Sequence, residues 1–248
     1  MFILCAGMEK SGSRYFYEVL KEIIILKGGM DGQEVAKKYR LGKITDGGRK
    51  YLKVMNYKTL IKLCIISLFE GDFVLKTHKE PTRAISFFNR LGLIKIYYTF
   101  RDPRDALLSA IDHGKRIIEN KKENEQSHVF VKMYKNQDQA AMYTKPWTKT
   151  WKKYNDEPHV IMVKYEEIIQ DTDKLITLFE RTLRYKLDEK TKKSLIMKYS
   201  LNKVQSDFLK FHYNKGISYR YKTEMSSKVR KQCLIEFGDE LEQMGYSE

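Results

Sequence analysis

Short runs of apolar residues alternate along this chain with longer segments in which apolar residues recur every three or four positions. The first such run, Phe2 to Ala6, predicts a buried strand. The segment from Ser11 to Leu26 then has apolar side chains at the spacing of one helix face. The chain therefore opens with a predicted strand, a short loop and a predicted helix.

The same alternation continues through the next part of the chain. Further strands are predicted at residues 72–76, 93–100 and 160–163, and further helices at residues 57–69, 82–91 and 103–118. The last of these helices has a clear start signal, because Asp102 can cap its N-terminus and Pro103 suits a first turn. Strands that alternate with helices predict an α/β fold, with a mostly parallel central sheet flanked by helices on both faces.

Three segments fall outside this alternation. Residues 28–50 are polar and glycine-rich, and the highly polar residues 119–145 are expected to be mobile or to cap a pocket. Residues 171–248 have a mostly helical pattern. No internal repeat is visible, and the length suits one large α/β domain, so we expect a single domain over residues 1–248.

The composition predicts a folded protein without a membrane span. Apolar residues make up 42% of the chain and aromatic residues 12%, which excludes a disordered chain. Lys62 interrupts the best candidate for a membrane span, residues 60–69. The first residues lack the charged flank and the length of a signal peptide, so a cytoplasmic location is expected. The three cysteines have neither metal-ligand spacing nor a paired framework, which predicts buried thiols and no metal site.

The net charge of +15 attracts anions to the surface of the protein. Nucleic acid, anionic lipid and a phosphorylated small molecule suit such a charge about equally well. The functional assignment therefore depends on local motifs rather than on charge.

The loop between the first predicted strand and the first predicted helix is one candidate site. Its sequence is Gly7-Met8-Glu9-Lys10-Ser11-Gly12-Ser13-Arg14. Free N–H groups and the helix dipole at such a position favour a bound anion, for example a phosphate. Lys10 precedes Gly12, whereas the lysine of a Walker A loop follows the second glycine, which disfavours an ATP or GTP hydrolase. Alternatively, Gly12 only makes a tight turn and Lys10 is a solvated charge.

A second candidate site, Lys76-Thr77-His78, stands at the end of a predicted buried strand. This is the edge at which open parallel sheets bind ligands. A neutral imidazole at physiological pH can take a proton from an attacking hydroxyl, which makes His78 a candidate base. A single histidine is about as often a structural residue as a catalytic one, so the assignment of His78 as a base depends on the residues around it.

A third candidate site follows the next predicted strand. Arg101 would leave the end of this strand as a planar group with several donors, and Ser109 lies eight residues later in the predicted helix. Both side chains could bind one phosphate. Alternatively, Arg101 forms a salt bridge with Asp105 at the helix start, and Ser109 is an ordinary surface residue.

Taken in order, these segments resemble the cytosolic sulfotransferases that use 3′-phosphoadenosine-5′-phosphosulfate (PAPS), and the resemblance extends in weaker form over most of the chain. The P-loop-like phosphosulfate-binding loop of that family, Lys-Ser-Gly-Thr-Thr-Trp, appears here as Lys10-Ser11-Gly12-Ser13-Arg14-Tyr15. The family's 3′-phosphate motif, Arg-Asn-Pro-Lys-Asp with a serine eight residues after the arginine, appears as Arg101 to Ser109. The family's Lys-Thr-His segment matches Lys76-Thr77-His78 in full.

Other matches to the family are less close. Tyr165 in Lys164-Tyr165-Glu166-Glu167 resembles a family tyrosine that contacts adenine, and Tyr15 in place of tryptophan can still stack on that base. The family's Arg-Lys-Gly segment against the 3′-phosphate appears as Asn214-Lys215-Gly216. Because the arginine is lost, the resemblance assigns this contact to Lys215 and the Gly216 backbone. Arg14, in place of threonine, could contact phosphate or acceptor.

The resemblance implies transfer of a sulfonate group from PAPS to a hydroxyl, or an amine, of a small-molecule acceptor. The released product would be 3′-phosphoadenosine-5′-phosphate (PAP). In this scheme His78 is the general base, Lys10 neutralises charge on the bridging oxygen, and Lys76 binds the sulfonate or the leaving phosphate, with no metal cofactor. A secondary metabolite, a sugar or a phenol would each be compatible as the acceptor.

Two alternatives stay open from the sequence. A P-loop nucleotide kinase also has a glycine-containing strand-to-helix loop and a basic cleft, although the position of Lys10 argues against it. A basic nucleic-acid-binding protein would account for the charge. No recognised nucleic-acid motif appears, and Lys-rich stretches such as Lys190 to Lys193 are typical of solvated helix faces, so no specific nucleic-acid binding is expected.

Overall fold

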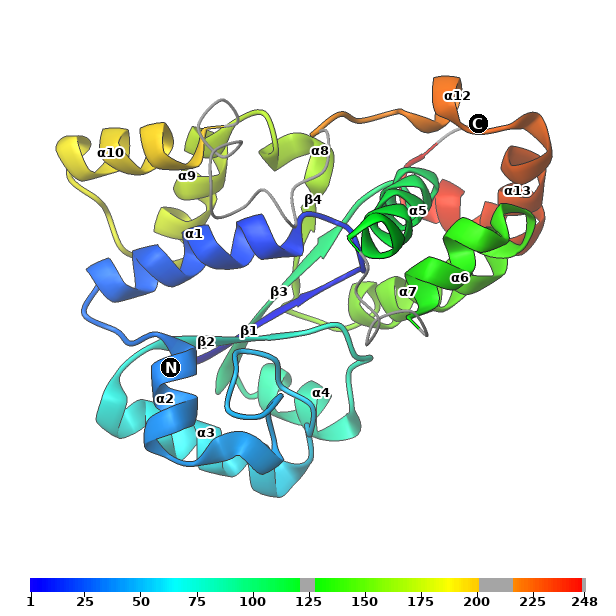
Figure 1. Ribbon diagram of the computed structural model, residues 1–248. Helices are drawn as coiled ribbons and strands as arrows, with labels where there is room; N and C mark the ends of the chain where they lie inside the picture. The colour runs from blue at the N-terminus through cyan, green and yellow to red at the C-terminus, as the bar shows by residue number, and fades with distance from the viewer. Residues whose placement is uncertain (121–127, 201–215, 247–248) are drawn as a thin grey trace.

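A four-stranded sheet lies at the centre of the protein. The computed structural model describes residues 1–120, 128–200 and 216–246. The strands are β1 (Phe2–Gly7), β2 (Phe73–Thr77), β3 (Ile94–Phe100) and β4 (Ile161–Lys164). All of their pairings are parallel, in the order β2-β1-β3-β4. The expected α/β fold with a parallel sheet is confirmed, and helices connect the strands (Figure 1).

The register of the strands brings their carboxyl ends to one edge. Strand β1 lies between β2 and β3, and its residue Phe2 is opposite both Phe73 and Ile94. The three strands start level and run in the same direction. Gly7 at the end of β1 and Thr77 at the end of β2 therefore lie at the same edge of the sheet, where parallel sheets bind ligands.

Helices begin where the sequence supplies caps. The longer helices are α1 (Ser13–Leu26), α3 (Tyr57–Glu70), α5 (Pro103–Glu119), α7 (Ala140–Asn155), α9 (Thr172–Leu183), α10 (Glu189–Tyr199) and α13 (Ser227–Gln243). The shorter ones are α2 (Gly32–Lys38), α4 (Arg83–Arg90), α6 (Val129–Lys135), α8 (Tyr165–Ile168) and α12 (Tyr221–Glu224). Asn56, Thr82 and Asp102 cap α3, α4 and α5, each by accepting a hydrogen bond from a backbone N–H of the first turn.

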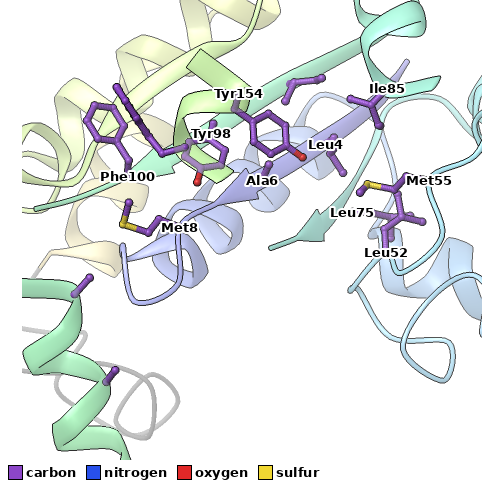
Figure 2. Packing of buried hydrophobic residues seen from close by; sticks show 14 of the residues in the cluster. Leu4, Ala6, Met8, Leu52, Met55, Leu75, Ile85, Tyr98, Phe100 and Tyr154 are labelled. Carbon is purple, nitrogen blue, oxygen red and sulfur yellow. The ribbon is translucent and has the colours of Figure 1, made fainter. Parts of the chain in front are cut away.

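The sheet separates two hydrophobic cores, because alternate residues of a strand point to opposite faces. Leu4 belongs to the larger core, which side chains of α3, α4, α5, α7 and α13 complete. Figure 2 shows part of this core, in which the rings of Tyr98 and Tyr154 stack with centroids 4.6 Å apart. Ile3 and Cys5 belong to the second core, under α1, α9 and α10.

The predicted elements lie within a few residues of the observed ones, but the polar segments contain helices that the pattern did not reveal. Residues 28–50 include α2, which buries Val35 and Ala36. Of the two expectations for residues 119–145, a mobile segment or a cap over a pocket, the structure supports the second. Helix α6 and the start of α7 occupy the described part, and Phe130 of α6 faces a cavity. Residues 121–127 lie outside the described residues.

The described residues also bear on two expectations from composition. Cys5 and Cys233 are buried thiols as expected, whereas Cys64 is only partly buried. In residues 1–120, 128–200 and 216–246 we find no helix with the length and apolarity needed to cross a membrane.

Candidate active site

A cavity of about 290 Å³ opens at the carboxyl edge of the sheet. Its walls come from the loop after β1, the ends of β2 and β3, helix α5, and the side chains of Phe130 and Tyr165. All three candidate sites from the sequence contribute to this one cavity. The residues are more than 90 positions apart in the chain, from Lys10 to Arg101, and the parallel register brings them together.

The loop after β1 is held in an unusual backbone conformation. Lys10 and Gly12 both have positive φ angles, of 61° and 72°. The Ser11 hydroxyl is turned inward, where it lies 2.7 Å from the Met8 carbonyl and 3.1 Å from the Thr99 carbonyl. These bonds tie the loop to the end of β3 and fix the left-handed residues on either side, so that the Lys10 side chain lines the cavity.

Gly12 lies directly under an aromatic ring. A Cβ at this position would be 2.6 Å from two ring carbons of Tyr165. Gly12 also precedes α1 without offering a side-chain cap, so the first-turn amides of α1 have no partner from that residue. Only glycine fits both the positive φ and the close ring, and the result is a helix N-terminus open to an anion.

Lys10 is partly buried in the wall of the cavity. Its ammonium donates to His113 Nδ1 over 3.1 Å and lies 5.6 Å from the ring centroid of Phe130. Burial, followed by the positive charge of Arg116, lowers the pKa of Lys10 to about 8. A buried ammonium among other cations is unfavourable by itself, so this position favours an anionic ligand.

Lys76 is a second cation held beneath the cavity. Its side chain is buried, and burial is the main cause that lowers its pKa to about 8. The ammonium lies 5.4 Å from the ring centroid of Tyr51. Tyr51 reaches the site because it pairs with Lys76 along the edge of β2, where the Leu52 N–H donates to the Lys76 carbonyl over 2.7 Å.

His78 is oriented for proton transfer by one backbone contact. Its Nδ1 lies 2.7 Å from the Gly7 carbonyl oxygen, which can only accept, so Nδ1 carries the hydrogen and Nε2 the lone pair of the neutral ring. Burial lowers the pKa of His78, and the negative charge of Glu9 opposes this effect. Nε2 is 4.0 Å from the Glu9 carboxylate. His78 therefore presents a neutral basic nitrogen to the cavity at neutral pH.

Arg101 follows β3 and lines the same cavity. Its guanidinium lies 4.3 Å from the ring centroid of Tyr165, and it donates to Asp105 over 3.1 Å and to the Ile217 carbonyl over 2.8 Å. The buried Nε–H of Arg101 has no acceptor within the described part of the chain. Ser109 is buried and also lines the cavity. The salt bridge to Asp105 therefore exists alongside a cavity position for Arg101, and Ser109 is not a surface residue.

Asp105 fixes the segment that follows residue 216. Its carboxylate accepts from the backbone N–H groups of Tyr219 and Tyr221, over 2.7 and 3.0 Å. Gly216, which has a φ of 68°, immediately precedes the Ile217 carbonyl that Arg101 contacts. The structure thus brings Gly216 close to Arg101 along the chain, although Gly216 does not itself line the cavity.

The remaining predicted site residues differ in their placement. Ser13, Arg14 and Tyr15 line the cavity with Gly12, and the Tyr15 hydroxyl lies 3.0 Å from that of Thr172. Ser11 does not line the cavity, since its side chain supports the loop from within. Lys215, like Asn214, lies outside the described residues.

Five residues of the cavity wall were not found from the sequence. They are Glu9, Tyr51, His113, Phe130 and Ile169. Glu9 stood inside the quoted loop but was given no role. His113 lies four residues after Ser109, one helical turn further along α5, and this spacing is the signal that could have revealed it. The other three come from segments in which no motif was recognised.

Comparison with known proteins identifies the family. The sulfotransferase domain model matches residues 2–242 of this chain. Mouse sulfotransferase SULT7A1 complexed with PAP is 14% identical, with a TM-score of 0.64 over 97% of this chain and 84% of that one. Retinol dehydratase, in complex with androsterone and inactive cofactor PAP, is 18% identical, with a TM-score of 0.55 over 97% of this chain and 80% of that one. The search of curated proteins found no match to this sequence.

This chain belongs to the sulfotransferase family, because the family model covers nearly its whole length. The prediction of a sulfotransferase from the three motifs is therefore confirmed, and the solved structures share its fold. The alternative of a P-loop kinase finds no support in these comparisons.

Proposed function

We propose that this protein transfers the sulfonate group of PAPS to a hydroxyl, or an amine, of a small-molecule acceptor and releases PAP. One observation carries the proposal: a single cavity joins two lysines, one buried and one partly buried, a neutral histidine base and a buried arginine N–H that lacks an acceptor among the described residues. The lysines and the arginine suit a ligand with two separate anionic groups. PAP, which is bound in both solved structures described above, has that character.

The donor would lie along the cavity from Arg101 to Lys10. The 5′-phosphosulfate would accept hydrogen bonds from the first-turn amides of α1 and from Lys10. The 3′-phosphate would accept hydrogen bonds from the Nε–H of Arg101 and from the Ser109 hydroxyl. The rings of Tyr15 and Tyr165 line the cavity and would stack on the adenine of the donor. Lys215 and the Gly216 backbone complete the proposed 3′-phosphate contacts.

The transfer step uses groups on both sides of the sulfur. The acceptor oxygen attacks sulfur and forms the new S–O bond while its proton passes to Nε2 of His78. The bond from sulfur to the bridging oxygen breaks, and the electron pair stays on the phosphate of PAP. Lys10 stabilises the charge that develops on this oxygen, and Lys76 binds the sulfonate or the leaving phosphate.

The acceptor would bind beside His78. Glu9 and Tyr51 lie next to His78, and the rings of His113 and Phe130, with centroids 5.3 Å apart, line the same cavity. Such a lining suits a small polar molecule that has a flat or apolar portion. The proposal includes a cytoplasmic location, for which the buried thiols of Cys5 and Cys233 are the support.

Calorimetric titration with PAP tests the donor site, with ADP and ATP as controls for the 3′-phosphate. We expect tight binding of PAP, weak binding of ADP, and a loss of roughly tenfold or more in PAP affinity in Arg101→Ala, since a charge-assisted contact contributes about 1.5–3 kcal/mol. Arg83→Ala, on exposed α4, is the matched control and should bind as the wild type does. Preference for ATP, or equal effects of the two variants, would contradict the proposal.

A further inference from the structure

Helix α3 exposes a row of apolar side chains that nothing in the described chain covers. Leu68 is 82% exposed and Phe69 is 78% exposed, the largest values among the exposed large apolar residues described. Tyr57, Ile61 and Ile65 are each about half exposed. Positions 57, 61, 65 and 68 follow the three-to-four spacing of one helix face, so these side chains form a continuous stripe.

Helix α4 and the turn after it extend this stripe. The rings of Tyr57 and Phe87 touch, with centroids 5.9 Å apart, and the Cys64 thiol lies 3.9 Å from the Leu93 carbonyl. Phe87, Leu91 and Leu93 are all exposed. We call the combined surface the α3–α4 ridge, which consists of Tyr57, Ile61, Ile65, Leu68, Phe69, Phe87, Leu91 and Leu93. In Figure 1 both helices lie on the same side of the sheet.

The exposed charges on the two helices of the ridge are positive. Lys58 and Lys62 lie next to the stripe on α3, and Arg83 and Arg90 are exposed on α4. The acidic residue of these two helices is Glu70 at the end of α3, whose side chain is only 10% exposed and pairs with Lys38. Exposed basic residues that flank an apolar face characterise helices that lie in the surface of an anionic membrane.

We propose that the α3–α4 ridge binds the surface of an anionic lipid membrane. The shape of the ridge favours lipid over a protein partner, because its most exposed apolar side chains, Leu68 and Phe69, protrude at the end of α3. A protruding side chain needs a fitted pocket in a protein, whereas a lipid surface accepts it without one. The net charge of +15 strengthens attraction to an anionic membrane.

The position of the ridge is compatible with a free active site. Leu68 and Phe69 lie just before β2 starts at Phe73, at the amino edge of the sheet. The cavity, with His78, lies at the carboxyl edge. A protein bound to a membrane through the ridge therefore keeps its cavity away from the lipid surface, and PAP binding should not depend on vesicles.

Sedimentation with lipid vesicles tests this surface. We expect the protein to bind vesicles of equimolar phosphatidylserine and phosphatidylcholine, and not vesicles of phosphatidylcholine alone. The double variant Leu68→Ser/Phe69→Ser should lose most of this binding. Ile235→Ser, which changes a 66% exposed apolar residue on α13, is the matched control and should bind as the wild type does.

The charged flank is tested separately. Each substitution in Lys58→Gln/Lys62→Gln should weaken the apparent vesicle affinity by about fivefold, since one basic residue near an anionic surface contributes about 1 kcal/mol. Lys190→Gln/Lys193→Gln on exposed positions of α10 removes the same charge elsewhere and should have a smaller effect. Thermal melting and PAP titration of every variant exclude misfolding as the cause.

Three results would overturn the proposal. One is a wild-type protein that does not bind the anionic vesicles. Another is an equal loss of binding in the ridge variants and in their matched controls. The third is concentration-dependent self-association, measured by sedimentation velocity, that Leu68→Ser/Phe69→Ser abolishes while vesicle binding is unchanged, because the ridge would then be an interface between two copies. None of these outcomes bears on PAP binding, so the test is independent of the proposed function.

Discussion

The two ends of the proposed donor site, a lysine end and an arginine end, hold positive charge in different ways. Lys76 is buried and Lys10 partly buried, neither with a carboxylate partner at hydrogen-bond distance in the described residues, and burial is the main cause that lowers the pKa of each to about 8. Arg101 is instead fixed by Asp105, the Ile217 carbonyl and the Tyr165 ring. A guanidinium stays charged in any of these surroundings, whereas a buried ammonium responds to pH and to its ligand. The difference suits a reacting centre at one end and a fixed binding site at the other.

The largest effect is expected from the base at the reacting end. His78→Ala should lower kcat by about 10²- to 10⁴-fold, because Nε2 can no longer take the acceptor's proton. PAP affinity, measured by calorimetry, should stay near that of the wild type. His159→Ala changes an exposed histidine outside the cavity and serves as the control. Loss of PAP binding together with activity would instead mean that His78 has a structural role.

Gly12 belongs to the loop that holds Lys10 and lies against the ring of Tyr165, on which Arg101 packs, so its replacement should disturb both ends. Gly12→Ala places a Cβ at 2.6 Å from the Tyr165 ring and forces a residue with φ of 72°. We expect a loss of about 2–4 kcal/mol in the free energy of unfolding, from backbone strain and overpacking, with weaker PAP binding. The measurement is chemical denaturation of the variant with and without PAP.

Gly47→Ala separates backbone strain from the ring contact. Gly47 has a φ of 59° but nothing within 4 Å of the added Cβ. Its replacement should lower the free energy of unfolding by about 1–2 kcal/mol, the cost of the left-handed conformation alone, and should leave PAP affinity unchanged. If Gly12→Ala and Gly47→Ala lower the free energy of unfolding equally, the Tyr165 ring moves aside at little cost and does not fix the loop.

The pH dependence of PAP binding distinguishes the lysine end from the arginine end. In the free protein the pKa of Lys10 and of Lys76 is about 8, and a bound phosphate raises both, so binding above that pH takes up protons. PAP affinity should therefore fall as pH rises above about 8, by up to about tenfold per pH unit for each lysine. PAP itself keeps its charge in this range. Calorimetry from about pH 7 to about pH 9.5 measures this dependence.

Lys10→Arg provides the matched variant for this measurement. Arginine keeps its charge when buried, so the variant should lose the share of the pH dependence that Lys10 contributes. Arg101→Ala should bind PAP more weakly at every pH and should keep a fall in affinity, which begins at slightly higher pH because the charge of Arg101 lowers the pKa of Lys10. A PAP affinity that does not change with pH in the wild-type protein would mean that the two lysines stay charged in the free cavity.

The sequence predicted most of the sheet and the three motif segments, because buried parallel strands and capped helices have strong local patterns. Leu93 to Phe100 and the Asp102-Pro103 start of α5 are examples. The sequence could not show that Ser11 points inward, since the Thr99 carbonyl that accepts its hydroxyl is 88 residues away. It also could not place Tyr51, which reaches the cavity only through its pairing with Lys76. Such contacts depend on register between distant segments rather than on local pattern.

Of the described residues that line the cavity, Glu9 is the one with a carboxylate. Its negative charge acts on His78, the proposed base. Its carboxylate lies 4.0 Å from Nε2 of His78 and raises the pKa that burial lowers. Glu9→Gln removes this opposing charge, so the pKa of His78 should fall further, and the base should stay neutral to lower pH. The acid limb of the kcat profile should then move to lower pH by about one unit or less, with little change at neutral pH. Measuring kcat against pH checks this shift.

The direction of the shift decides what Glu9 does. Glu34→Gln, on an exposed part of α2, is the control and should leave the profile unchanged. A shift to lower pH would mean that Glu9 tunes His78 through its charge alone. A shift to higher pH, or a large loss of kcat at every pH, would contradict that reading, because a carboxylate that only tunes the base is not needed once the imidazole is neutral. In that case Glu9 would itself contact the acceptor or its proton, and the reacting end of the cavity would contain two acid–base groups.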